Sequence, residues 1–256
     1  MKFIVRFFPE ISIKSRPVRK RMVKQLQNNI RRVLRRYDDQ VTVHSNWDHL
    51  QVVSRLGNQT EHAQKLRHLL ARIPGIAYFN QVKEYDFVDF QDAFEKTHQH
   101  YEQLLINKTF RVRCKRAGKH EFNSLDVEKY IGGGLNQHCQ SAGVKLKDPD
   151  VVVMVEIKDD KFFVVTERIE GLGGYPLGCQ DTVATLISGG FDSGVAAYKM
   201  LKRGLRTHFV FFNLGGRAHE IGVKQVSKYH LQFYYHQNFV RVEILSLPKF
   251  LRLLKL

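Results

Sequence analysis

The chain has 256 residues and is 43% hydrophobic, which is enough for more than one packed core. Its 41 Lys and Arg residues exceed its 25 Asp and Glu residues, so the formal net charge is +16. A polyanionic partner is therefore expected, nucleic acid before an anionic membrane surface. The N-terminus is too short and too charged for a signal peptide, and no apolar run reaches the length of a membrane span. A cytoplasmic location without membrane contact is predicted.

The first 83 residues predict the order strand, helix, strand, strand, helix, strand. Alternating residues over 2–8 indicate a strand, and Ser15 is the expected cap of a helix that carries one buried stripe. A hairpin, a helix over 60–70 and a strand over 76–82 complete the series. This order is typical of a ferredoxin-like domain, which is expected over residues 1–83.

The surface of the first long helix is basic throughout, and the first acidic residue after Ser15 is Asp38. A solvated helix usually mixes both signs of charge, so contact with nucleic acid is favoured, although a plain solvated face stays open. The candidate RNA-binding residues of this helix are Arg19, Lys20, Lys24, Arg31 and Arg35.

Residues 84–170 predict a second α+β domain. A helix over 89–105 precedes a strand over 109–116. Ser124 is the expected cap of a further helix, and that helix contains Gly132-Gly133-Gly134, which is costly unless the backbone packs closely against another element or RNA. A hairpin over 151–168 follows, and the glycine-rich stretch 171–176 is interpreted as a flexible joint at a domain boundary. The candidate RNA-binding residues of this region are Arg111, Arg113, Lys115, Arg116 and Lys119.

The stretch 185–195 predicts a strand, an anion-binding loop and a helix. Gly189 and Gly190 let the backbone approach a ligand closely, and the N–H groups at the helix start suit a phosphate. Ser188 and Ser193 add hydroxyl donors, and Asp192 adds a carboxylate for a metal ion or a reacting phosphate. No Lys-Ser/Thr pair follows the glycines, so the loop is not a Walker A motif. A glycine turn without a ligand is the alternative.

Strand and helix alternate after this loop, with strands over 206–212 and 239–245 and a helix over 219–229. This alternation predicts a parallel, doubly wound sheet with its ligand at the carboxyl ends of the strands. The fold class is thus two α+β domains followed by a partial α/β domain over 171–256. The sheet is expected to be incomplete and to expose apolar surface.

The loop sequence S-G-G-F-D-S resembles the PP-loop of the ATP pyrophosphatases, which cleave ATP between the α and β phosphates. Other motifs in the same order make the chain similar to the bacterial tRNA sulfurtransferases that form 4-thiouridine, from Met1 to about Tyr229. The resemblance implies a ferredoxin-like and a THUMP domain that hold tRNA, then a PP-loop domain. The motifs are residues 2–4, 8–11, 72–76, 118–120, 132–138 and 186–195.

The resemblance also implies ATP and Mg²⁺ as cofactors, adenylation of the target uridine followed by sulfur transfer, and sulfur supply for the thiazole of thiamine. By position, Asp192 would be the catalytic residue that activation needs. Nucleotide-binding roles would fall to Leu186 and Ile187 beside the adenosine, to Ser188, Gly189, Gly190 and Ser193 at the phosphates, and to Phe211 and Phe212 at the next strand end.

The resemblance implies a sulfur-carrying cysteine late in the PP-loop domain, and this chain ends before that position. Cys114, Cys139 and Cys179 match none of the sulfur cysteines and are interpreted as structural, and no metal site is expected. The stretch after about Leu231 departs from the pattern, so a truncated or frameshifted gene is expected. Implied partners are tRNA and a cysteine-desulfurase-type sulfur donor, and a homodimer stays open. The alternative function is a tRNA-binding fragment without turnover.

Overall fold

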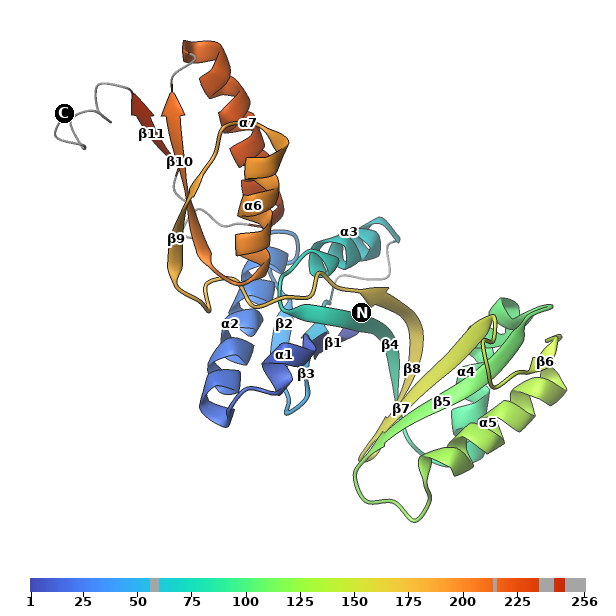
Figure 1. Cartoon of the computed structure of the whole chain (residues 1–256). Helices are drawn as coiled ribbons and strands as arrows, with labels where there is room; N and C mark the ends of the chain where they lie inside the picture. The colour runs from blue at the N-terminus through green and yellow to red at the C-terminus, as the bar shows by residue number, and fades with distance from the viewer. Residues whose placement is uncertain (56–59, 214–215, 235–241, 247–256) are drawn as a thin grey trace. The chain divides into compact units, whose positions relative to one another are not determined.

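The computed structural model describes residues 1–55, 60–213, 216–234 and 242–246 (Figure 1). Most of the stretch predicted to be divergent, 235–241 and 247–256, lies outside the described residues. The chain forms two compact units. One contains Met1–Phe3 with Asn80–Arg168, and the other contains Ile4–Phe79 with Ile169–Leu256. Within the described ranges, every helix is too short or too polar to span a bilayer.

The N-terminal region confirms the ferredoxin-like prediction. Its strands lie in the order β2-β3-β1-β4, with β2 antiparallel to β3. The stripe Met22, Leu26, Ile30 and Leu34 of α2 is buried, as its spacing predicts. Ser15 occupies the cap position of α2, but its side chain makes no capping hydrogen bond, so Pro17 in the first turn is the stronger start signal. The elements are β1 Lys2–Phe7, α1 Pro9–Ser12, α2 Arg16–Leu34, β2 Thr42–Ser45, β3 His49–Val53, α3 Thr60–Ala71 and β4 Ile76–Asp86.

The unit that contains residues 80–168 has two helices packed on a sheet with the strand order β4-β8-β7-β5-β6. Strand β5 runs parallel to β7, and β7 pairs with β8 as the predicted hairpin. Its core includes Phe110, Ile131 and Phe162, none of which has exposed surface. The further elements are α4 Phe90–Leu105, β5 Thr109–Ala117, α5 Ser124–His138, β6 Gly143–Val144, β7 Val151–Lys158 and β8 Lys161–Glu170.

Two local features of α5 differ from the sequence prediction or extend it. Its cap is Asn123 rather than Ser124, because the Asn123 side chain accepts from two backbone N–H groups and Asp126 completes a capping box. Gly134 packs closely against the ring of Phe94 on α4, where an added Cβ would lie 2.5 Å from a ring carbon. Gly133 faces open space. Packing against α4 thus explains one of the three glycines.

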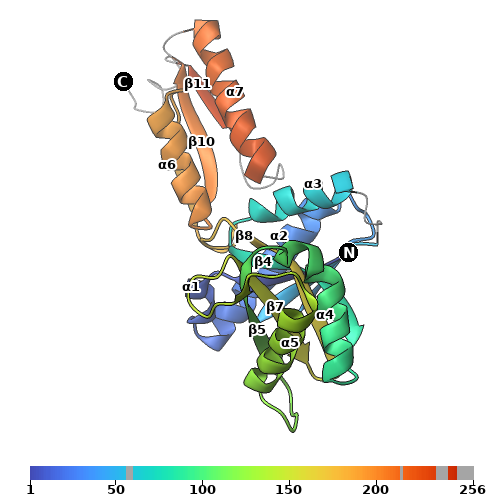
Figure 2. The same cartoon turned by 90° about the vertical axis from the view of Figure 1, so that its right-hand side faces the viewer.

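The last region confirms the parallel α/β prediction. Strands β9 Thr182–Leu186, β10 Arg206–Asn213 and β11 Val242–Ser246 form a parallel sheet in the order β11-β10-β9. Helices α6 Phe191–Lys202 and α7 Gly216–Tyr234 pack against β10 and against each other (Figure 2). Helix α7 begins three residues before the predicted start, at Gly216.

The stretch 171–176, predicted as a flexible joint, is held by backbone hydrogen bonds. The Gly171 and Gly173 N–H groups donate to the start of β4, and Gly75 N–H donates back to Gly173 O at 2.9 Å. Tyr175 N–H then donates to Lys202 O at the end of α6, at 2.9 Å. These bonds fix the path of the chain from β8 to β9.

Candidate functional site

The predicted anion-binding loop lies between the end of β9 and the start of α6. Ile187 is buried, and its N–H donates to Val210 O of β10 at 2.9 Å, so the loop leaves the sheet at this point. Gly189 has φ of 84°, a conformation that disfavours residues with a Cβ. A Cβ there would also lie 3.2 Å from a methyl carbon of Val223. Both observations explain why the position is glycine.

Hydroxyl groups close the loop on itself. Ser188 N–H donates to Ser193 Oγ at 3.3 Å, and Ser193 Oγ donates to Gly190 O at 2.9 Å. Gly190 is the helix cap and has no side chain that could cover the first N–H groups of α6. Those groups carry the positive end of the helix dipole, which attracts an anion.

His219 reaches the same loop from the first turn of α7. Its Nε2 lies 2.7 Å from Ser188 O, so the ring N–H is the donor. The Phe211 and His219 rings are nearly perpendicular, with centroids 5.0 Å apart. Sequence reasoning missed His219, because nothing in a linear pattern relates it to a loop 31 residues earlier.

The predicted adenosine-side residues divide between the two faces of the sheet. Phe211 is only 1% exposed and lies on the face that α6 and α7 cover, whereas Leu186 is 62% exposed and shares the open face with Phe212. Asp192 is exposed in the first turn of α6. The loop, Asp192 and the open-face pair all lie at or near the carboxyl ends of β9 and β10, where parallel α/β sheets bind ligands, and together they are the candidate site.

The carboxylate of Asp192 would be the ligand of a magnesium ion beside bound phosphates. Mg²⁺ keeps several waters and takes one or two carboxylates plus phosphate oxygens, so a single exposed carboxylate beside the phosphate loop fits it. Among the residues that the structure describes, no cluster of three or more His, Cys, Asp or Glu side chains could hold a metal ion by itself.

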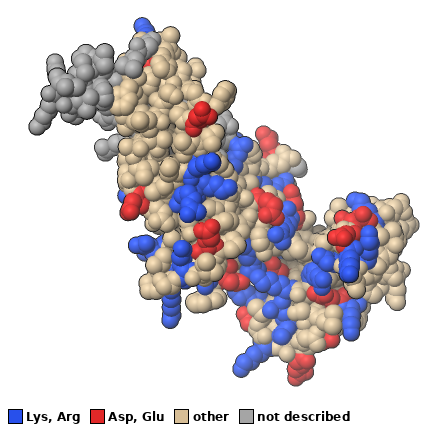
Figure 3. Space-filling model, in the orientation of Figure 1, with Lys and Arg blue, Asp and Glu red and all other residues tan. Residues whose placement is uncertain are grey.

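The predicted RNA-binding residues of α2 divide into two groups. Arg19, Lys20 and Lys24 line one hollow of about 610 Å³. Arg31 instead donates to Val43 O at 3.2 Å and so also fastens β2 to the helix. Arg35 is exposed in the turn that follows α2. Figure 3 shows Lys and Arg side chains on the surface over the α2 region.

Three of the predicted RNA-binding residues around β5 form contacts within their own unit. Arg111 donates to Leu146 O at 2.9 Å, and Arg113 pairs with Glu128 at 3.2 Å. Arg116 lies 3.0 Å from the His120 ring. Lys115 and Lys119 are exposed on the surface of this unit.

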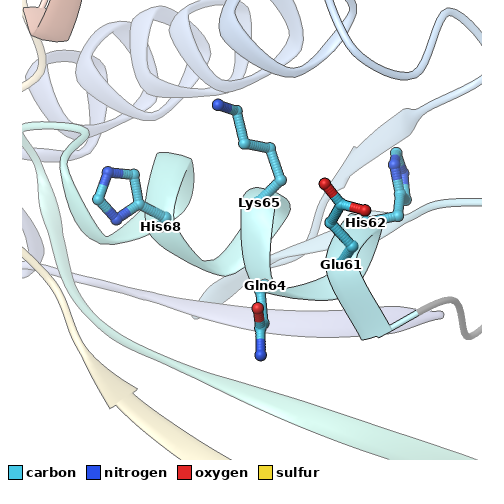
Figure 4. Close-up of a pocket in the computed structure, with 5 residues that line it drawn as sticks. All are labelled: Glu61, His62, Gln64, Lys65 and His68. Atoms are coloured by element: carbon cyan, nitrogen blue, oxygen red, sulfur yellow. The ribbon is translucent and has the colours of Figure 1, made fainter.

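A second hollow, of about 670 Å³, lies along α3 (Figure 4). Burial lowers the pKa of His68, with the charges of Arg72 and Lys65 acting in the same direction. All the lining side chains come from one helix, and Gln64 and Lys65 point in opposite directions (Figure 4). They do not converge on one point, so no ligand chemistry follows from this hollow.

The three thiols lie in environments that keep them protonated. Burial, aided by Glu128, raises the pKa of Cys114 to about 12, and burial raises that of Cys179 to about 11. Burial also raises the pKa of Cys139. Because the thiolate is the reactive form, these cysteines are poor nucleophiles.

Family models match three consecutive parts of the chain. A ThiI ferredoxin-like domain matches residues 2–80, a THUMP domain matches 87–167, and the model of the thiamine biosynthesis protein ThiI matches 178–254. Relatives named tRNA sulfurtransferase from Colwellia psychrerythraea and Aeromonas salmonicida are each 54% identical over 229 residues. In sequence and in domain order the chain is similar to the tRNA sulfurtransferases (ThiI). The matches cover 90% of this chain and 47% of each relative, so it spans about half their length.

Solved structures support the same fold. The match to PH1313 from Pyrococcus horikoshii covers all of this chain and 82% of the PH1313 chain, with a TM-score of 0.82 at 22% identity. The match to a 4-thiouridine synthetase, solved in complex with RNA and bound ATP, covers 98% of this chain and 63% of the synthetase chain, with a TM-score of 0.78 at 25% identity. The ferredoxin-like, THUMP and ThiI-type domains predicted from the sequence are confirmed.

Proposed function

We propose that the chain acts in ATP-dependent sulfur transfer to a tRNA uridine, giving 4-thiouridine. The observation that carries the proposal is the loop 187–193, which combines a positive-φ glycine, two hydroxyls and a helix N-terminus at the end of a parallel strand. The 52% to 54% identical relatives named tRNA sulfurtransferase give the reaction class.

In this proposal the N–H groups at the start of α6 bind the phosphates of ATP, and Ser188 and Ser193 keep the loop in the binding conformation. Leu186 and Phe212 border the adenosine from the open face, whereas Ile187 and Phe211, which the sequence also placed at the adenosine, are buried and support this edge of the sheet. Asp192 would hold Mg²⁺ beside the reacting phosphate, where the ion would offset developing negative charge. The uridine oxygen would displace diphosphate from the α-phosphate of ATP, and the resulting adenylate would leave as AMP when sulfur replaces that oxygen. The ATP bound in the solved 4-thiouridine synthetase–RNA complex supports ATP use.

Sulfur delivery is proposed to depend on groups other than the three cysteines of this sequence, because burial keeps Cys114 and Cys179 protonated. A cysteine-desulfurase-type protein is the proposed sulfur donor. The family-model description as a thiamine biosynthesis protein supports a second role in sulfur supply for thiazole. A cytoplasmic location and a homodimer complete the proposal.

A tRNA-binding fragment without turnover is the second candidate. The chain spans 47% of its relatives, and the basic residues of α2 suffice for binding without an active site. Under this alternative the PP-loop region would be formed but would not cleave ATP.

ATP cleavage in the presence of tRNA and Mg²⁺ separates the two candidates. Release of AMP and diphosphate should fall by about 100-fold or more in Asp192→Asn, because a ligand to the metal and reacting phosphate is lost. Asp181→Asn, which changes another exposed carboxylate just before β9, should leave the rate unchanged. tRNA binding without ATP cleavage would contradict the sulfurtransferase proposal and favour the binding fragment.

A further inference from the structure

The hollow on α2 contains an exposed aromatic ring as well as cations. We call it the basic pocket and define it by Lys14, Arg16, Arg19, Lys20, Lys24 and Trp47. Its volume of about 610 Å³ lies in the range of sites for small organic ligands. The cations come from the start of α2 and the residues before it, and Trp47 comes from the turn between β2 and β3.

Trp47 is held by Arg19 and still exposes most of its ring. The Arg19 guanidinium carbon lies 4.6 Å from the indole centroid, and the same side chain donates to Trp47 O. Trp47 is nevertheless 73% exposed. Exposing an indole to water is unfavourable, and the Arg19 contacts restrict its motion, so the ring is a preorganised flat surface.

The electrostatic environment of the basic pocket is positive. Five of its defining residues are Lys or Arg, and the described residues that line it include no Asp or Glu. The nearest acidic residue in sequence, Asp48, pairs with Arg6 and lies 2.7 Å from Nδ1 of His49. Its charge is therefore compensated by Arg6, and neither residue lines the pocket. An anionic ligand that also presents a flat ring fits this arrangement best.

We propose that the basic pocket binds an unpaired nucleotide of RNA, with its base stacked on Trp47 and its phosphates against Lys20 and Lys24. The proposal rests on the proposed tRNA binding. It adds that Trp47 contacts the base and that the bound nucleotide is unpaired. Bases within a duplex are already stacked on one another, so only an unpaired base can use the ring. An acidic protein segment would use the cations but would leave the indole exposed.

Trp47 is the single tryptophan of the chain, so its fluorescence reports on the pocket directly. The full chain is titrated with a single-stranded RNA and with a blunt-ended RNA duplex of equal length, at the same salt concentration. The single strand should quench the fluorescence with saturation, and the duplex should leave it nearly unchanged while it binds through phosphates. Equal quenching by both RNAs would overturn the proposal.

Variants test the energetic contribution of the ring. Trp47→Leu should weaken single-strand binding by about tenfold or more, measured by anisotropy of labelled RNA, and Trp47→Phe should recover part of the loss. Neither change should alter the salt dependence, whereas Lys24→Ala should reduce its slope by about one. Tyr37→Leu is the matched control, because Tyr37 is an exposed ring beneath Lys65, at 5.1 Å, outside the pocket.

The outcomes separate the two proposals. A chain that binds tRNA with no change in Trp47 fluorescence, or a Trp47→Leu variant that binds as tightly as Tyr37→Leu, overturns the nucleotide pocket and leaves the proposed function standing. A chain that binds neither tRNA nor single-stranded RNA overturns both.

Discussion

His219 donates a hydrogen bond from Nε2 to the carbonyl oxygen of Ser188 at 2.7 Å. The bond joins the first turn of α7 to the anion-binding loop after β9. Because the Ser188 carbonyl is engaged, the loop keeps its curvature, and the N–H groups at the start of α6 remain available to an anion. His219 therefore acts as a positioning residue for the candidate nucleotide site.

Replacement of His219 should weaken the proposed ATP cleavage without removing it. One hydrogen bond contributes about 1 kcal/mol, so His219→Ala should lower the rate about fivefold. His219→Gln keeps an N–H donor and should retain more of the rate. Steady-state ATP cleavage with tRNA measures both variants. A His219→Ala rate equal to that of the wild type would show that the bond does not support the loop.

The adjacent glycines of α5 should respond to alanine in opposite directions. No heavy atom lies within 4 Å of a Cβ built on Gly133, so Gly133→Ala should stabilise the helix by about 0.5–1 kcal/mol. A Cβ on Gly134 would lie 2.5 Å from the Phe94 ring, and overpacking should destabilise that variant by about 1–3 kcal/mol. Thermal unfolding followed by circular dichroism compares them. Equal shifts in Tm would contradict the close packing of α4 on α5.

The stability of the protein should depend more on the charge of the side chain at position 29 than on its size. It is 7% exposed, and its side-chain amide donates to Leu177 O at 3.0 Å, beside Gln25, which donates to the same oxygen at 2.9 Å. Asn29→Asp replaces a buried donor by a carboxylate that faces a carbonyl oxygen, so it should destabilise by about 3 kcal/mol.

The matched variant is Asn29→Ala, which should destabilise less because Gln25 can still donate to Leu177 O. Urea unfolding followed by circular dichroism ranks the two. Greater stability of Asn29→Asp than of Asn29→Ala would contradict this role for the amide.

The thiols should react slowly in the native protein. With pKa values of about 12 for Cys114 and about 11 for Cys179, roughly one thiol in a thousand or fewer is ionised at pH 8. Iodoacetamide should modify both at least about 100-fold more slowly than in urea, where the ordinary pKa returns, as mass spectrometry would show. A native rate equal to the rate in urea would contradict the raised pKa values.

Periodicity predicts much of the fold, and competing local signals explain the errors. The buried stripe of α2 gives a clear helical period, and the apolar run into Gly189 gives the strand-to-helix switch. The predicted cap of the helix over 124–138 is wrong, because Asn123 and Ser124 are both good caps and only the Asp126 side chain decides between them. Backbone pairing of Gly171 and Gly173 is a tertiary contact, which composition cannot predict.

The site is predictable where it is continuous in sequence. Ser188 through Ser193 form one loop, and the structure brings them together as expected. His219 and Trp47 come from other elements and carry no local signal. From its charge, Arg31 is predicted to contact RNA. Its hydrogen bond to Val43 O depends on the packing of β2 against α2, which the charge does not predict.

Binding of tRNA as a function of salt concentration, with and without ATP and Mg²⁺, tests whether this chain joins an RNA-binding surface to a nucleotide site. We expect steeply salt-dependent binding that Asp192→Ala leaves intact, together with ATP cleavage that this variant loses. That pattern would mean that the RNA-binding surface and the nucleotide site are both formed and act separately. Absence of tRNA binding by the wild-type chain at low salt would show that the proposed function is wrong.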